Sequence, residues 1–196
     1  MIVVVGCGRS GTKYTSECMK AAGYDFRHER LGTYGGIGWN LALPHAIKKI
    51  ASTHKDIVVL HQIRNPVDSI ATLKAHGDVI WNRLEAVIPD LPNTNRLLCA
   101  MRYWYEYNIY CSRMAQYSYD VADLKLNSHV AMDLDAYGLC GKWGTVKTDI
   151  NHRPHIDTTW RKLVDTDSLL AHKLMSAWGQ FCSNRMLHFH EAVICL

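Results

Sequence analysis

Residues 6–15 read Gly6-Cys7-Gly8-Arg9-Ser10-Gly11-Thr12-Lys13-Tyr14-Thr15, and this stretch decides the fold. It follows the apolar run 2–5 directly and precedes an amphipathic segment, so the order is strand, turn, helix. Glycines let the backbone come close to an anion, and the first amides of a helix are unpaired donors at the positive end of its dipole. The sequence therefore predicts a loop that binds phosphate or sulfate; we call residues 6–15 the glycine-rich loop.

The position of Lys13 distinguishes this loop from that of nucleoside triphosphatases. Their pattern needs Gly-Lys-Ser/Thr, whereas here Gly11 is followed by Thr12 and only then by Lys13. Basic and hydroxyl side chains next to the glycines still suit the binding of a polyoxyanion. Alternatively, Arg9 and Lys13 are solvated side chains on an exposed turn and bind no ligand. We expect the anion to be bound by Gly8, Arg9, Ser10, Gly11, Thr12, Lys13 and Tyr14.

The composition indicates one ordinary globular domain over residues 1–196. No apolar run approaches the roughly 18 residues that a membrane span requires, and the run 1–5 is too short for a secretory signal. The mild net charge of +4 favours anionic small ligands and does not indicate a nucleic-acid surface.

The seven cysteines are odd in number and show no paired Cys-X-X-Cys spacing. Four of them lie in apolar segments, which is typical of free thiols in a reducing compartment and predicts a cytoplasmic protein: Cys18, Cys99, Cys111 and Cys182. Two groups of cysteine and histidine lack the spacing of a zinc site, so no metal is expected: Cys140 with His152 and His155, and Cys182 with His188 and His190.

Hydrophobic patterning predicts three strands, at 2–5, 57–63 and 117–121. The second is β-branched without polar alternation, as in a strand of a parallel sheet that is covered on both faces. Helices are expected over 11–22, 39–51, 66–74, 78–88, 96–116 and 159–182. The glycine-rich stretch 24–38 predicts a functional loop or a lid, and 138–158 an irregular segment. The expected fold class is a three-layer α/β/α structure with a central parallel sheet.

A second polar segment begins where the strand 57–63 ends, and it reads Arg64-Asn65-Pro66-Val67-Asp68-Ser69-Ile70-Ala71-Thr72. Ligands of open parallel sheets gather at the carboxyl ends of the strands. Arg64 offers a fork of donors to a phosphate, and Ser69 or Thr72 can add a hydroxyl. The alternative for Arg64 is an ion pair with Asp68.

Together the two segments resemble the sulfotransferase family, enzymes that use 3′-phosphoadenosine 5′-phosphosulfate (PAPS) on a P-loop-like α/β fold. Arg9-Ser10-Gly11-Thr12 matches the family's 5′-phosphosulfate loop, with Arg9 in the cationic position as in tyrosylprotein sulfotransferases. Arg64 precedes Thr72 by eight residues, the interval between the arginine and the serine of the family's 3′-phosphate motif. Thr72 departs from that serine but keeps a hydroxyl, and Ser69 is the alternative.

Two weaker likenesses lie further along the chain. Residues 121–124 resemble a strand-ending Glu-Asp-Leu segment of many members, and Asn151-His152-Arg153 followed by Trp160 resembles a C-terminal loop of bacterial members. The second likeness implies that Arg153 reaches the 3′-phosphate. The resemblance as a whole implies a five-stranded parallel sheet flanked by helices, PAPS as the donor and PAP as the product.

Sulfuryl transfer needs a base for the acceptor hydroxyl and fixed positive charge, which Arg9, Lys13 and the loop amides would supply. Glu29 matches approximately the catalytic glutamate of the tyrosylprotein members, and it is our candidate for the base. His28 is a competitor, as are His45 and His61, although His61 also fits a hydrogen-bonded core histidine. Glu29 could otherwise be an exposed carboxylate paired with Arg27 or Arg30.

Two alternatives to a sulfotransferase follow from the sequence. A nucleotide kinase or ATPase would use the loop with Mg-ATP and would need an acid at a strand end, for which Asp123 is the candidate. A non-catalytic anion-binding protein would keep the loop and lack the base. The sequence does not distinguish four classes of acceptor, namely a saccharide, a lipid, a small metabolite and a protein tyrosine. The acceptor site is either built from residues 24–40 and 138–158 or completed by the second subunit of a homodimer.

Overall fold

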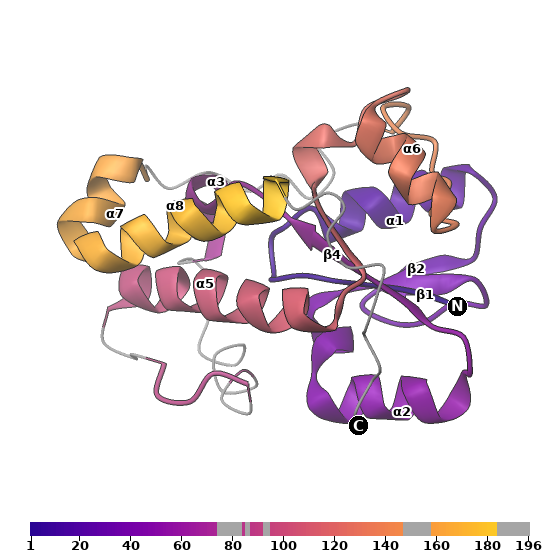
Figure 1. Ribbon diagram of the computed structural model, residues 1–196, viewed down its shortest axis with the longest axis horizontal. Coiled ribbons are helices and arrows are strands. Elements are labelled where there is room, and N and C mark those ends of the chain that lie inside the picture. The colour runs from indigo at the N-terminus through magenta and orange to yellow at the C-terminus, as the bar shows by residue number, and fades with distance from the viewer. Residues whose placement is uncertain (74–83, 85–86, 92–94, 147–157, 184–196) are drawn as a thin grey trace.

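A computed structural model describes residues 1–73, 84, 87–91, 95–146 and 158–183 (Figure 1). Five parallel strands form one sheet in the order β2-β3-β1-β4-β5. Their bounds are β1 (Ile2–Val5), β2 (Phe26–His28), β3 (Gly35–Ile37), β4 (Val58–Ile63) and β5 (Tyr117–Asp120). The expected α/β class and the parallel sheet flanked by helices are confirmed.

The sheet lies between two helical layers because alternate residues of β1 face opposite sides. Val3 and Val5 pack in a core with α2 (Pro44–Thr53), α3 (Pro66–Leu73), α5 (Arg96–Met114), α7 (Trp160–Thr166) and α8 (Ser168–Ser183). Ile2 and Val4 pack in a second core with α1 (Thr12–Ala21) and α6 (His129–Ala136). Figure 1 shows α1 and α6 on one side of the sheet and α2 and α5 on the other.

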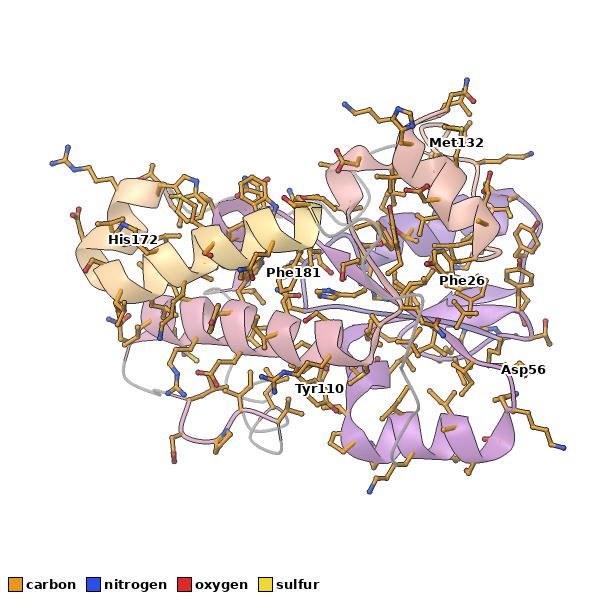
Figure 2. The ribbon with its side chains drawn as sticks, in the orientation of Figure 1. Phe26, Asp56, Tyr110, Met132, His172 and Phe181 are labelled. Carbon is orange, nitrogen blue, oxygen red and sulfur yellow. The ribbon has the colours of Figure 1, made fainter. Side chains whose placement is uncertain are left out.

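The labelled phenylalanines mark the two layers in Figure 2. Phe26, from β2, is fully buried in the core beneath α1 and α6. Phe181, from α8, belongs to the core of the opposite face. The outer surface of the first layer carries the exposed Met132 of α6, which Figure 2 shows pointing away from the sheet.

The prediction of a loop or lid over 24–38 was wrong, since this stretch holds the strands β2 and β3. Glycine is depleted in strands, which concealed β3. At Gly35 a Cβ atom would lie 2.1 Å from the carbonyl oxygen of Ile2, and at Gly36 a Cβ atom would lie 2.2 Å from that of Arg30. The glycines therefore let neighbouring backbone approach where a side chain would collide.

Three helix predictions also change. The stretch 39–51 begins as the short 3₁₀ helix η1 (Trp39–Ala42) and restarts as α2 at Pro44. The stretch 159–182 is two helices, because Asp167 separates α7 from α8 and its carboxylate accepts the Leu170 amide at 2.9 Å. Helix α6 was not predicted, although Ser128 caps it by accepting the Ala131 amide at 3.1 Å. The expected helix 78–88 lies mostly outside the described residues.

Helix α5 forms the centre of the larger core. Trp104 of this helix is fully buried. Tyr103 and Tyr107 of the same helix are also buried, and their rings lie 5.2 Å apart. The free cysteines Cys18, Cys99 and Cys111 are buried and Cys182 is half-buried, as expected of small apolar residues. In the described part of the chain, no helix has the length and apolar character needed to cross a bilayer.

His61 is a hydrogen-bonded core residue on β4, as one of the two sequence interpretations held. Its Nδ1 lies 3.1 Å from the Ser118 hydroxyl and its Nε2 lies 3.0 Å from Oδ1 of Asn108. Burial lowers the pKa of His61 from 6.5 to about 4, and the Asn108 contact only partly offsets this. The imidazole is therefore neutral in the folded protein at neutral pH.

This burial predicts acid-sensitive stability. Below its unfolded pKa the unfolded chain binds a proton that the folded chain excludes, so the free energy of unfolding should fall by about 2 kcal/mol between about pH 7 and pH 5. Urea denaturation at a series of pH values measures this. His61→Gln should reduce the pH dependence, whereas His45→Gln, at an exposed position of α2, should leave it unchanged. A wild-type curve that is flat over this range would contradict the assignment.

Candidate functional site

The glycine-rich loop lies at the carboxyl end of β1 and leads into α1. Two glycines allow the backbone of the loop to lie close to neighbouring segments. A Cβ atom at Gly6 would lie 2.2 Å from the carbonyl oxygen of Gln62, and Gly11 has a φ of 83°, with the Val121 side chain 3.0 Å from where its Cβ atom would be. The loop is thus held between β4 and the segment that follows β5.

Gln62, a fully buried residue of β4, holds the loop in place through hydrogen bonds from the neighbouring strand. Its Nε2 donates to the Ser10 carbonyl at 2.7 Å. Its Oε1 accepts from the hydroxyls of Thr15 at 2.5 Å and Tyr119 at 2.9 Å. A buried amide with its partners in place has one stable orientation, so the backbone of the loop is fixed before a ligand arrives.

Tyr103 supports the same loop from α5. Its hydroxyl accepts the Gly8 amide at 2.7 Å. The Ser10 hydroxyl donates to the Cys7 carbonyl at 2.8 Å and so closes the turn from within. Sequence reasoning missed Gln62 and Tyr103, and the available signal was a polar residue in an otherwise apolar strand and a tyrosine hydroxyl in a core helix.

Arg9 and Glu29 both adopt left-handed backbone conformations, with φ of 70° and 58°. Among the described non-glycine residues, only Asp90 and Asn127 share a positive φ, and asparagine and aspartate tolerate it well. For arginine and glutamate it costs on the order of 1 kcal/mol and is typical of functional sites. The two sequence candidates for charge stabilisation and for the base therefore both lie at strained positions.

The first turn of α1 is open to an anion. Gly11 is the N-cap and no side chain caps the helix. Thr12 is buried, and its hydroxyl lies 2.9 Å from Nε2 of His28. The hydroxyl of Tyr14 accepts the Gly144 amide at 3.1 Å, and Lys13 is exposed. The predicted residues of the loop are thus gathered at one helix end, with His28 beside them.

The second polar segment lies next to the loop because β4 pairs with β1 in parallel. The guanidinium of Arg64, directly after β4, lies 3.6 Å from the Asp68 carboxylate. The ion pair with Asp68, which was the alternative to phosphate binding by Arg64, is therefore formed, although the distance between the charged groups is long. Asp68 is about half exposed, and a pair of this kind contributes little.

Ser69 and Thr72 differ in how their hydroxyls are used. The Thr72 hydroxyl donates to the Ser69 carbonyl at 2.9 Å within α3. The Ser69 hydroxyl is buried and makes no hydrogen bond with any described residue. A buried hydroxyl without a partner costs free energy unless a ligand or water satisfies it. Ser69 is therefore better suited than Thr72 to bind a ligand.

The acid at the end of β5 is Asp120, not Asp123, which lies in the 3₁₀ helix η2 (Val121–Asp123). Asp120 is buried, and its carboxylate accepts the Trp178 indole N–H at 2.9 Å and the Ala122 amide at 2.9 Å. Burial raises the pKa of Asp120, while these two donors and the charge of Arg64 oppose the rise. Asp120 is thus a structural acid beside Arg64.

The candidates for the base lie at the end of β2. The Glu29 carboxylate accepts the Trp39 indole N–H at 3.2 Å, and the Glu29 carbonyl accepts from the Asn40 amide at 2.8 Å. Glu29 is exposed, as the alternative interpretation held, but the pairing with Arg27 is not made, because Arg27 binds Asp25 at 2.7 Å. Burial lowers the pKa of the half-buried His28, and Lys13 adds to the effect while Glu29 opposes it. His28 is therefore neutral near pH 7 and can accept a proton.

A groove of about 420 Å³ adjoins the loop on the side of β2. It is bounded by α1 and by the segment that contains β2, and we call it the α1–β2 groove; its lining is Lys13, Glu17, Lys20, Tyr24, Asp25, Arg27, His28 and Arg30. A larger hollow of about 520 Å³ lies near Met1, Val58 and Gly138. It is at the opposite, amino end of the strands, away from the loop.

Some predicted residues cannot be placed. Arg153, His152, His155, His188 and His190 lie outside the described residues. In the part of the chain that the structure describes, no three histidine, cysteine, aspartate or glutamate side chains form a group that could hold a metal ion.

Comparison with known proteins found no family model, no curated protein and no solved structure that matches this chain.

The close contact of the loop with β4 can be tested by Gly6→Ala. The added methyl would collide with the Gln62 carbonyl, a backbone group that cannot move without breaking the sheet. We therefore expect the free energy of unfolding to fall by about 1–3 kcal/mol or more. Denaturant unfolding measures this. Gly179→Ala is the control, because nothing lies within 4 Å of its Cβ position in α8 and alanine should stabilise that helix by about 1 kcal/mol. Equal stability of both variants would refute the placement of the loop.

Proposed function

We propose that this protein is a PAPS-dependent sulfotransferase that transfers a sulfuryl group to a hydroxyl or amine acceptor. The observation that carries the proposal is the pairing of β1 with β4, which sets the Arg9-Ser10-Gly11-Thr12 loop beside Arg64 and Ser69. A donor with a 5′-phosphosulfate and a separate 3′-phosphate requires two neighbouring anion sites. The two polar segments found in the sequence meet that requirement.

The residues present fit such a donor. The uncapped first turn of α1 offers amides to the 5′-phosphosulfate, with Arg9 as the cation. Two groups suit a second phosphate: the buried Ser69 hydroxyl, which has no partner among the described residues, and the partly exposed guanidinium fork of Arg64. When bound, PAPS supplies a sulfuryl group whose bond to the 5′-phosphate breaks as the acceptor oxygen bonds to sulfur, the electron pair leaving with PAP.

The protein's own groups supply position, charge and a proton acceptor. Gln62 and Tyr103 hold the loop in one conformation, so its amides need no reorganisation when charge shifts toward the departing phosphate. Glu29 accepts the acceptor's proton, and the Trp39 indole N–H orients its carboxylate. His28 lies next to it, bonded to Thr12, and is the competing base.

The arrangement suits a triphosphatase less well. Nucleotide kinases and ATPases hold Mg²⁺ with an acid near the loop, and β4, the strand that would present it, is followed by Arg64. Asp120, at the end of β5, is buried and already accepts two N–H groups. Among the described residues, neither β4 nor β5 therefore ends in an acid that is free to hold Mg²⁺ for the competing Mg-ATP function.

Ligand-induced stabilisation separates the two classes of enzyme. At a concentration of about 100 times its Kd, PAP should stabilise the protein by about 2.7 kcal/mol, and Mg-ATP should have little effect. Thermal unfolding with each ligand measures this, and transfer of labelled sulfate from PAPS to a panel of acceptors then tests activity. Strong stabilisation by Mg-ATP and none by PAP would overturn the proposal. Binding of PAP without transfer to any acceptor would favour the non-catalytic alternative.

A further inference from the structure

We propose that the α1–β2 groove is the acceptor site and that the acceptor is a saccharide that already carries anionic groups. The inference rests on the proposed function, because it names the substrate class of the same site. Apart from Lys13, the residues that line the groove lie outside the two segments that we assign to the donor, the glycine-rich loop and the segment that begins at Arg64.

The order of the strands separates donor and acceptor. Arg64 and Ser69 follow β4, on one side of β1, whereas the groove lies at β2, beyond β3 on the other side. A donor bound by the loop and by Arg64 thus extends away from β2. Lys13, at the end of the loop, and His28, the last residue of β2, also line the groove. An acceptor in the groove would therefore reach the sulfuryl group from the side opposite the leaving phosphate, as in-line displacement requires.

The charge of the groove indicates an anionic acceptor. Four lysine and arginine side chains line it, against two carboxylates, so its net charge is positive. Glu17 pairs with Lys20 at 2.8 Å and Asp25 pairs with Arg27 at 2.7 Å. Within the described chain this leaves Lys13 and Arg30 without an ion pair in the groove.

The dimensions fit a short chain of rings. Lys13, Glu17 and Lys20 are spaced along one face of α1, and seven residues of helix extend about 10 Å. A volume of about 420 Å³ lies within the range of about 300–1,000 Å³ that is usual for ligand pockets. Tyr24, at the far end, packs one side of its ring against Tyr34, with the ring centroids 4.2 Å apart, and the rest of the ring lines the groove, where it suits the apolar face of a sugar.

An extended peptide suits the groove less well. A peptide would bind by adding a strand to the edge strand β2. The outward groups of Phe26 are already used, since its carbonyl accepts the Ser16 hydroxyl at 3.0 Å and its amide donates to the Tyr24 carbonyl at 2.8 Å. A peptide would therefore find no backbone partner at Phe26, whereas the charged side chains of the groove are available for recognition, which favours a ligand bound through its anionic substituents.

Binding of a sulfated heparin tetrasaccharide, measured by calorimetry without any nucleotide, tests the inference. We expect Lys13→Gln with Arg30→Gln to weaken binding about tenfold or more, because these are the two groove cations without an ion pair in the described chain and each would give the ligand a charge-assisted hydrogen bond. Lys48→Gln with Lys49→Gln, which removes two exposed lysines of α2, should change binding less than about twofold. Maltotetraose, which has no charge, should not bind.

Spectroscopy of the unmodified protein gives a second reading that needs no variant. The tetrasaccharide should shift the NMR resonances of residues 13–30 and leave those of α2 unchanged. Equal affinity of the two double variants, or shifts confined to α2, would overturn the site. Binding of hexaglutamate as tight as that of the tetrasaccharide would overturn the saccharide assignment. If the tetrasaccharide binds in the groove and PAP does not bind, the proposed function fails and the binding site stands; if PAP binds and the tetrasaccharide does not, only this inference fails.

Discussion

Glu29→Gln is expected to lower kcat by roughly 10²–10⁴-fold and to leave PAP affinity unchanged, because it removes a proton acceptor and little else. Glutamine keeps the size of the side chain and an oxygen that can accept the Trp39 indole N–H. The left-handed backbone at Glu29 is the same in the variant. Steady-state kinetics with labelled PAPS measures kcat, and calorimetry with PAP measures binding.

His28→Gln is the matched comparison for the base. It removes the neighbouring imidazole while leaving a group that can bond to Thr12, which lies 2.9 Å from it. If Glu29 is the base, this variant should lose far less activity than Glu29→Gln. The reverse ranking, with Glu29→Gln close to the wild-type rate, would assign the proton to His28.

The loop and the strand that precedes it could be predicted from sequence because their signals are local. An apolar run, a turn of glycines and a helical period follow one another within residues 2–22. The strand end at Arg64 was equally clear, since Pro66 begins the next helix there. What joins the two segments is the register of β1 against β4, which is a long-range pairing that no local pattern contains.

The supporting residues could not be predicted for the same reason. Gln62 reaches Ser10 across 52 positions of sequence, and Tyr103 reaches Gly8 across 95. In a single sequence, Gln62 is only one residue of a strand and Tyr103 only one residue of a helix, and no local pattern shows that either contacts the loop. The strand β3 was hidden by glycines whose absence of a side chain is itself a tertiary requirement, and its neighbour β2 is only three residues long. The segment that contains β2 forms one side of the groove and carries the candidate bases His28 and Glu29, so a strand that the sequence did not reveal bears on the acceptor.

Arg64→Ala is expected to weaken PAP binding by about tenfold to a hundredfold, which corresponds to the loss of a charge-assisted hydrogen bond of about 1.5–3 kcal/mol. The loss should appear as a raised Kd and a raised KM for PAPS, with kcat little changed at saturation, because Arg64 lies on the far side of the loop from the candidate bases. The fold should survive, since the Trp104 indole N–H bonds to the backbone carbonyl of Arg64 and not to its side chain. Calorimetry with PAP measures the effect.

Asp68→Asn separates a ligand-binding role of Arg64 from a structural one. The ion pair spans 3.6 Å with Asp68 about half exposed, so it holds the guanidinium only weakly. If Arg64 serves the 3′-phosphate, removal of Asp68's charge should keep PAP affinity or raise it slightly, because a competing anion is gone. Arg64→Lys should fall between alanine and wild type, since a lysine keeps the charge and loses the fork. Normal PAP affinity in Arg64→Ala, or equal losses in Arg64→Ala and Asp68→Asn, would mean that the pair only braces the start of α3 and that the second phosphate must be bound elsewhere.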